Sequence, residues 1–357
     1  MKKFVVSSFV FLFVFAMVGV VFAGSSVSKN NKKDVPEEVK VFTLGQARVA
    51  VAEASFLSNE TANIILDNSG NYTFFKKQGS NAGDVEDFDG LTMYIKAFGG
   101  QDKLDMKDYT KFNTTYYSVM LGLDTDRQYT DNFDATYGVF VSYAGVQSEE
   151  ENFNDDKISQ NGIFAGVRGN WYVDKLFFGA ILDYGFISNK TEFFAQEKNW
   201  SEDYNIQSIG LSVKAGYNFE IKERSFTIQP NIIFNINYLI TEEYDALTGY
   251  VNGGKFKTDD MTNFAAAPGV KLAKTLGKCW ILSGEGKYVF VSTSNGDIKV
   301  ESDSQCKYVP ETYYKDYASL GLGIEKIWGY TVLHLKVNKN LCGRDGFIIN
   351  AGIEFKF

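Results

Sequence analysis

The sequence predicts an all-β membrane barrel of about twelve antiparallel transmembrane strands, with an N-terminal α-helix through the lumen. Three observations carry this prediction. Apolar and polar residues alternate with period two along most of the chain, the connections alternate between long and short, and the last strand is strongly amphipathic. In a barrel surrounded by lipid, the apolar face of each strand points outward and the polar face lines the lumen.

The last strand, 347–357, shows this alternation most clearly. Its apolar face carries Phe347, Ile349, Ala351, Ile353, Phe355 and Phe357, and its polar face carries Asn350, Gly352, Glu354 and Lys356. A bare amphipathic edge strand invites aggregation, and pairing with the first strand would remove that edge. An ordinary strand of a soluble β-sandwich is the alternative interpretation.

The first 23 residues predict export. Lys2 and Lys3 precede a long apolar run, and we expect a signal peptidase to cleave between Ala23 and Gly24. An uncleaved membrane anchor is the alternative, because the apolar run is long. No later apolar run approaches the length of a membrane helix, so an exported chain of alternating strands indicates the outer membrane of a Gram-negative cell.

A long helix is predicted between Asp34 and Gly70. Asp34 and Glu37 have the spacing of a capping box, and Pro36 suits a first helical turn. The helix is too polar to face lipid, but its many alanines would let it pass through a narrow, wet lumen. A periplasmic or coiled-coil-like extension is the alternative. The expected divisions are a signal peptide at 1–23, a short polar N-terminus at 24–35, helix and connection at 36–90, and barrel at 91–357.

The rest of the chain divides into strands and connections. Strands are expected near 91–99, 114–124, 135–146, 159–173, 175–187, 209–219, 226–240, 262–274, 279–291, 313–327, 330–338 and 347–357. Long or polar connections are expected near 100–112, 147–158, 188–204, 241–261, 292–312 and 339–345, with mostly tight turns between them. Short periplasmic turns and long external loops are typical of outer-membrane barrels.

In this order, the helix, connection and strands from about residue 34 to 357 resemble the β-domain, or translocator, of autotransporters (type V secretion). The segments that carry the resemblance are 91–100, 119–124 and 166–171, together with the terminal Phe357. The resemblance implies a twelve-stranded barrel that passes an N-terminal passenger to the cell surface. Only about a dozen residues separate Ala23 from the helix, so we expect a vestigial passenger; a stand-alone translocator or a barrel with another use stays open.

The last residues also resemble the C-terminal signal of Gram-negative outer-membrane barrels, here Asn350, Gly352, Phe355 and Phe357. The partners expected from this interpretation are the barrel-assembly machinery, through the C-terminal strand, together with outer-membrane lipid and lipopolysaccharide. The net charge of −8 and the lack of a basic cluster argue against nucleic acid. The oligomeric state stays open.

No catalytic residue, cofactor or metal site is predicted, so we expect no enzyme activity. The single histidine, His334, has no partner for a metal site or a catalytic triad. Charged residues at inward strand positions are expected to line a solvated lumen, because lipid cannot host them. They are Lys96, Arg168, Asp183, Lys214, Lys271, Glu285, Lys287, Glu325, Lys336 and Glu354.

Two alternative functions remain at this point: a passive outer-membrane pore, and a surface or adhesive protein that acts through long loops such as 241–261. The three cysteines suggest a further feature of the outer loops. Cys306 and Cys342 are both expected there, so we predict a disulfide between them, with Cys279 free at the opposite end.

Overall fold

The structure is a computed structural model of the whole chain. It describes residues 37–67, 90–105, 111–130, 132–151, 157–195, 198–221, 225–242, 244–245, 255–258, 260–277, 279–294, 298–301, 306–308 and 315–357. The predicted signal peptide, with Ala23 and Gly24, and the polar segment 24–35 lie outside the described residues. So does most of the expected connection between the helix and the first strand.

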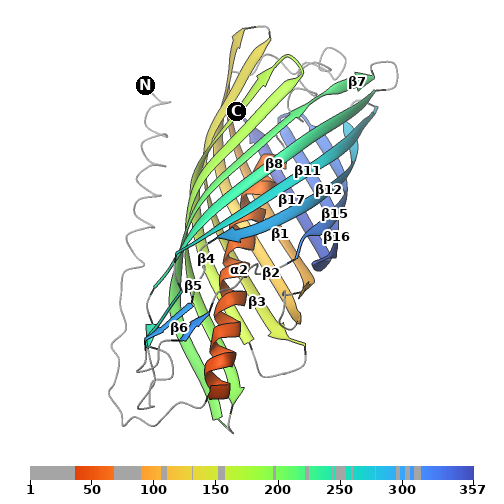
Figure 1. Cartoon of the computed structure of the whole chain (residues 1–357). Helices are drawn as coiled ribbons and strands as arrows, with labels where there is room; N and C mark the ends of the chain where they lie inside the picture. Colours follow the sequence, from red (N-terminus) through yellow and green to blue (C-terminus); the bar gives the residue numbers. More distant parts are fainter. Residues whose placement is uncertain are drawn as a thin grey trace, which may run out of the picture.

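Twelve antiparallel strands form a closed barrel (Figure 1). In order around the barrel they are β1 (Leu91–Asp105), β2 (Lys111–Thr130), β3 (Phe133–Glu150), β4 (Lys157–Val173), β5 (Leu176–Ala195), β6 (Lys198–Tyr217), β8 (Phe226–Thr241), β11 (Met261–Leu276), β12 (Trp280–Ser294), β15 (Tyr317–Trp328), β16 (Thr331–Cys342) and β17 (Arg344–Lys356). β17 pairs with β1 from Lys356 opposite Thr92 to Arg344 opposite Leu104, which closes the sheet. The predicted fold class is confirmed.

Four short strands lie outside the barrel wall, and a fifth, β7 (Phe219–Ile221), continues β6 in the wall and pairs with β8. β9 (Tyr244–Asp245), β10 (Lys255–Thr258), β13 (Ile298–Glu301) and β14 (Cys306–Tyr308) form a separate four-stranded sheet in the order β14-β13-β10-β9. This sheet arises from the connections after β8 and after β12, where the sequence predicted only loops.

The outer surface of the barrel is apolar. Large side chains that alternate with buried polar ones are left strongly exposed, such as Val167 at 53 %, Leu182 at 54 % and Leu322 at 75 %. A soluble protein rarely exposes so broad a band of large apolar residues. The same arrangement is the expected one where the wall faces hydrocarbon and every strand pairs on both sides.

Tight turns gather at one end of the barrel. Asp174, Gly277 and Gly329 occupy the left-handed backbone region there, with φ of 54°, 62° and 57°. Two of these three residues are glycines, which adopt this backbone conformation easily because they lack a Cβ. The opposite end also has one tight turn, between β16 and β17, where Cys342 has φ of 78°. The long connections after β8 and β12 lie at that end, and because short turns mark the periplasmic end of an outer-membrane barrel, it is the outer end.

Several strands are longer than the sequence predicted. β2, β5 and β6 each have 20 residues, whereas β15 and β16 have 12. A tilted strand needs only about 9–11 residues to cross the hydrocarbon core. The expected connections at 100–112, 147–158 and 188–204 are therefore wrong in large part, because the ladder continues past the apolar belt with polar outward residues such as Lys111 and Asn113.

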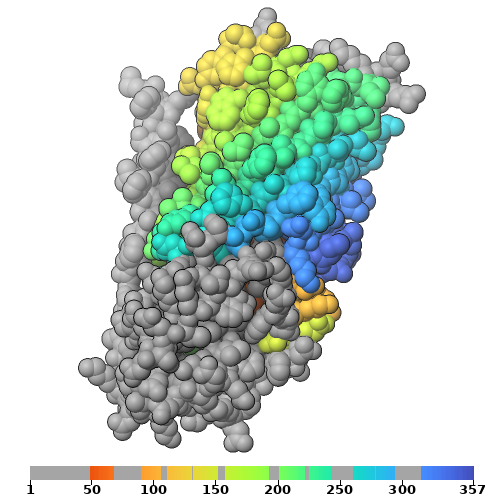
Figure 2. Space-filling view, viewed as in Figure 1, coloured from red at the N-terminus to blue at the C-terminus, as the bar shows by residue number. Residues whose placement is uncertain are grey.

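One helix, α2 (Glu37–Asp67), runs along the inside of the barrel (Figure 1). Little of the helix is visible in the space-filling view (Figure 2). Almost all residues from Val49 to Leu66 are buried, and the helix packs against β3–β6 and β8. No helix among the described residues combines the length and apolar character needed to cross a membrane.

Candidate functional site in the barrel lumen

The interface between α2 and the barrel wall is the candidate site, because it fills the lumen. The buried part of the helix carries polar side chains such as Glu53, Ser58 and Asn59, each 5 % exposed or less. A polar group that leaves water must find hydrogen bonds or counter-charges. The contacts that supply them fall into an outer cluster, a middle set and an inner cluster.

The outer cluster joins Glu53 of α2 to Arg344 of β17, Asp102 of β1 and Thr114 of β2. The Arg344 guanidinium lies 2.9 Å from Glu53 and 2.9 Å from Asp102, and none of these three side chains is exposed. The Thr114 hydroxyl donates a hydrogen bond of 3.1 Å to the second oxygen of Glu53. Burying such charges is favourable only with complete partners, and this geometry supplies them from three different strands.

The middle set consists of uncharged hydrogen bonds. The Ser58 hydroxyl donates to Asn237 Oδ1 at 3.0 Å, and the Asn237 amide donates to Asn59 Oδ1 at 2.7 Å. On β4, the Gln160 amide donates to the main-chain oxygen of Ala50 at 2.6 Å. These contacts hold the polar side of the helix against β4 and β8.

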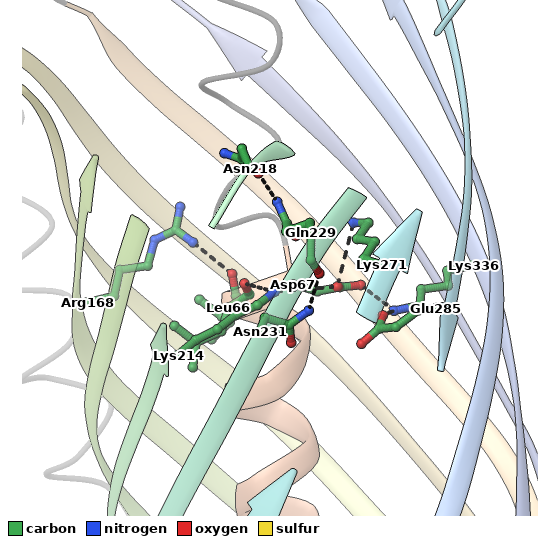
Figure 3. Close-up of polar contacts among 11 residues, drawn as sticks. Leu66, Asp67, Arg168, Lys214, Asn218, Gln229, Asn231, Lys271, Glu285 and Lys336 are labelled. Atoms are coloured by element: carbon green, nitrogen blue, oxygen red, sulfur yellow. Dashed lines mark hydrogen bonds and ion pairs between the residues drawn. The ribbon is translucent and has the colours of Figure 1, made fainter. Parts of the chain in front are cut away.

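The inner cluster holds the C-terminal end of α2 (Figure 3). Asp67, the last residue of the helix, lies 2.7 Å from Lys336, 3.8 Å from Lys271 and 4.0 Å from Lys214. A carboxylate at this position is unfavourable in isolation, because the helix dipole already places partial negative charge there. The last turn of α2 contains no basic residue, so lysines of β6, β11 and β16 supply the opposite charge.

Main-chain carbonyls at the same end are also capped by the barrel. The Lys214 ammonium donates to the oxygen of Leu66 at 3.2 Å, and Arg168 donates to the oxygen of Ile65 at 3.1 Å (Figure 3). Arg168 in turn makes a two-point ion pair with Asp124. The last carbonyls of a helix lack partners within the helix, and here basic residues of the wall complete them.

Each of the ten predicted lumen-lining charges occupies an inward position of a barrel strand. Five of them gather at the helix C-terminus, namely Arg168, Lys214, Lys271, Glu285 and Lys336, and Glu285 pairs with Lys336. Lys96 pairs with Glu354 at 3.3 Å. Asp183 accepts from Ser58 at 3.4 Å. Glu325 is also buried, and Lys287 lies two residues beyond Glu285 on β12. The functional role of the ten stays a prediction.

Sequence reasoning missed the residues that matter most at both clusters. Arg344 and Asp102 fell in expected connections, because the apolar alternation stops before them. Asp67 gave one usable signal: a carboxylate at the end of a polar helix without a basic neighbour needs cations from elsewhere. The sequence does not show which strands provide them.

His334 has a packing role in the structure. Its imidazole occupies the space that a Cβ at Gly352 would need, on the neighbouring strand β17. Among the described residues, no group of His, Cys, Asp and Glu side chains is arranged to hold a metal ion.

The cysteines and the C-terminal residues complete the predicted sites. Cys279 and Cys342 are free and exposed. The predicted disulfide between Cys342 and Cys306 is thus not formed in this structure; Cys342 ends β16, whereas Cys306 begins β14 in the separate sheet. Asn350 is buried, and the amide of Phe357 donates to the oxygen of Leu91 at 2.8 Å. Recognition of Asn350, Gly352, Phe355 and Phe357 as an assembly signal stays a prediction.

Known proteins share features of this fold. The profile of the family described as "Autotransporter beta-domain" matches residues 93–332. The fold is similar to the β-domain of the Bordetella autotransporter BrkA, with 15 % identity, a TM-score of 0.61, and coverage of 75 % of this chain and 100 % of BrkA's.

Two further solved structures are similar. The transport unit of AIDA-I from Escherichia coli has 18 % identity and a TM-score of 0.59, with 81 % of this chain and 98 % of that chain covered. The translocator domain of NalP from Neisseria meningitidis has 11 % identity and a TM-score of 0.59, with 84 % and 98 % covered. Identities this low establish a common fold. A search of curated protein sequences finds no match.

Proposed function

The chain belongs to the autotransporter β-domain family, and from that premise we propose that this outer-membrane translocator barrel passes an N-terminal segment of its own chain to the cell surface and is then closed by α2. The observation that carries the proposal is the enclosed helix, held by ion pairs to the wall at its C-terminal end and near its middle. A barrel of twelve strands is wider than the filled eight-stranded case, and here the helix takes up the additional space.

The direction of the helix supports this proposal. Asp67 lies beside Lys214, three residues before β6 ends at Tyr217, and thus toward the periplasmic end. Glu53 lies beside Arg344 at the outer end. The fourteen-residue step between Glu53 and Asp67 covers about 21 Å of helix, and the helix continues outward to Glu37. The N-terminal end of α2 is therefore directed toward the outer end of the barrel.

The two alternative functions gain less support. An open pore conflicts with a lumen whose helix is buried from Val49 to Leu66. A loop-mediated adhesive role finds no specific observation in its favour. The family is a transport domain, and we propose that this chain has no enzyme activity. We further propose that outer-membrane lipid, lipopolysaccharide and the barrel-assembly machinery, which would read the C-terminal strand, are its partners.

Single-channel conductance in planar bilayers tests the proposal. We expect a small conductance from the mature protein and a large one from a version that lacks residues 36–68. A synthetic peptide of residues 36–68, added to the enlarged channel, should lower its conductance again, and a scrambled peptide should not. Large and equal conductances from both versions would make the barrel an open pore and sink the proposal.

A further inference from the structure

The inward face of β8 carries an unusual concentration of uncharged amide side chains. Gln229, Asn231, Asn235 and Asn237 all point into the lumen side of the wall, and each is 8 % exposed or less. We call these four residues the carboxamide row. Only Ile233 interrupts it. Inward positions of a strand repeat every two residues, about 6.7 Å, which is also the repeat of the amide groups along an extended polypeptide.

The carboxamide row has unused acceptors. The side-chain oxygens of Gln229, Asn231 and Asn235 have no hydrogen-bond partner among the described residues, although all three are buried. Their amide nitrogens are engaged: Gln229 donates to Asn218 at 2.7 Å, and Asn231 donates to the main-chain oxygen of Gln229 at 3.1 Å. Buried acceptors are normally satisfied, and exceptions need an explanation. The three side-chain oxygens that remain available on this strand can accept hydrogen bonds from main-chain N–H groups.

The outer half of the row already binds α2, whereas the inner half does not. The Asn237 amide donates to the main-chain oxygen of Ser55 at 3.4 Å, and Asn235 donates to Asn63 at 3.4 Å. Among the described residues, no hydrogen bond joins Gln229 or Asn231 to the helix. Both lie nearer the periplasmic end, close to Asp67 (Figure 3). A segment that enters from the periplasm would reach Gln229 and Asn231 first.

The neighbouring strand adds little bulk beside the row. In the register of β8 and β11, Ala265 lies opposite Asn235, Ala267 opposite Ile233, and Gly269 opposite Asn231. Asn263, opposite Asn237, adds a second buried amide whose side-chain atoms both lack partners among the described residues. Lys271 lies opposite Gln229. The row itself is uncharged, and the small β11 residues opposite Asn231, Ile233 and Asn235 leave room for another main chain to approach.

We propose that the carboxamide row binds the main chain of an extended segment in transit and accepts hydrogen bonds from its N–H groups whatever its side chains are. The inference rests on the proposed translocation function and names the part of the wall that the moving chain contacts. Neutral amides suit this role because each hydrogen bond is modest in net strength. The wall can therefore replace the segment's hydrogen bonds to water without binding the segment too tightly to move on.

The test follows the appearance of an epitope at the cell surface. The epitope, in a Gly/Ser-rich segment, is inserted between residues 24 and 36 of the full chain, and its protease accessibility is measured by pulse–chase. We expect Gln229→Ala/Asn231→Ala to slow its appearance about fivefold to thirtyfold, the factor for two net hydrogen bonds of low to central strength. The matched control is Asn189→Ala/Thr191→Ala on β5, two buried inward residues at the same spacing whose side-chain oxygens already accept hydrogen bonds.

A conservative variant separates this role from a folding defect. Gln229→Asn/Asn231→Gln keeps both carboxamides and should restore most of the wild-type rate. Barrel assembly is monitored in parallel by the heat-dependent gel mobility of the folded protein, and it should be equal in all variants. Equal slowing by the β8 and β5 pairs, or no slowing by either, would overturn the inference.

A second inserted segment asks whether the contact is to main-chain N–H groups. Proline has no N–H, so a segment with proline at alternate positions should pass slowly through the wild-type barrel, and the Gln229→Ala/Asn231→Ala pair should not slow it further. Additive slowing would contradict main-chain binding. An epitope that never reaches the surface in the wild-type protein would instead count against the proposed function itself, which keeps the two failures distinct.

Discussion

Arg344 of β17 and Glu53 of α2 form an ion pair of 2.9 Å between two side chains that are fully buried, although 291 residues separate them in the chain. Asp102 shares the same guanidinium. The pair links the last strand of the barrel, the first strand and the enclosed helix at one point. Its charge balance therefore depends on all three elements being in place.

Removing Arg344 should strongly destabilise the folded barrel. Arg344→Ala leaves Glu53 and Asp102 buried with a principal counter-charge lost, and breaking a buried pair from one side costs about 3–5 kcal/mol. Urea unfolding in lipid vesicles measures the change. Arg127→Ala, at an exposed position on β2, is the control and should change the free energy of unfolding by less than about 0.5 kcal/mol. Equal midpoints for both variants would refute the prediction.

Reversing the charge of Asp67 should release the helix end without removing the helix. Asp67→Lys places a fourth cation among Lys214, Lys271 and Lys336, so the open fraction of single channels should rise about tenfold or more, as expected from losing a hydrogen bond to a charged group. Asp67→Glu should stay closed. Asp105→Lys, whose partner Lys315 is exposed, controls for general charge effects; opening by this control would argue against a specific role for Asp67.

The outward face of β5 should distinguish lipid from water by depth. Leu182 lies in the apolar belt and is 54 % exposed, so Leu182→Arg should cost about 2–4 kcal/mol of unfolding free energy in vesicles. Ser188, six residues further along the same face, lies toward the outer end, and Ser188→Arg should cost about 0–1 kcal/mol. Similar costs at both positions would show that the belt is misplaced.

Thiol labelling should report which end of the barrel faces outward. Cys342 and Cys279 are both free and exposed, and they lie at opposite ends of strands. A bulky, membrane-impermeant maleimide should label Cys342 in intact cells and Cys279 only after the outer membrane is permeabilised. Cys342→Ser and Cys279→Ser assign the signals. Labelling of Cys279 from outside would invert the topology, and a protected Cys342 would revive the predicted bond to Cys306.

The sequence alone was sufficient for the type and order of the main elements. Period-two alternation located all twelve barrel strands, and the polar, alanine-rich segment located a helix close to Glu37–Asp67. The lipid-facing residues are specified locally, because each must be apolar whatever its neighbour is. This is why Phe347 and Ile349, which are 55 % and 51 % exposed, could be placed on the outside before any register was known.

The contacts that hold the helix could not be read in the same way. Glu53 and Arg344 meet only because α2 adopts one depth and one rotation in the lumen, and neither is encoded by strand periodicity. The outer ends of the strands were missed for a related reason. Beyond the apolar belt, Lys111 and Asn113 lie in water, so the alternation disappears while the backbone hydrogen bonds continue.

The pairing of β1 with β17 has a consequence for biogenesis. The first and last barrel strands meet along thirteen residue pairs, so the wall cannot close until its final strand has been synthesised and delivered. Contacts this distant in sequence form slowly because a long loop must be ordered first. Until then, the sheet has two unpaired edges, β1 and its last available strand, and cannot surround α2. Pairing of β1 with β17 therefore requires the complete chain: only a chain that carries its last strand can enclose its helix.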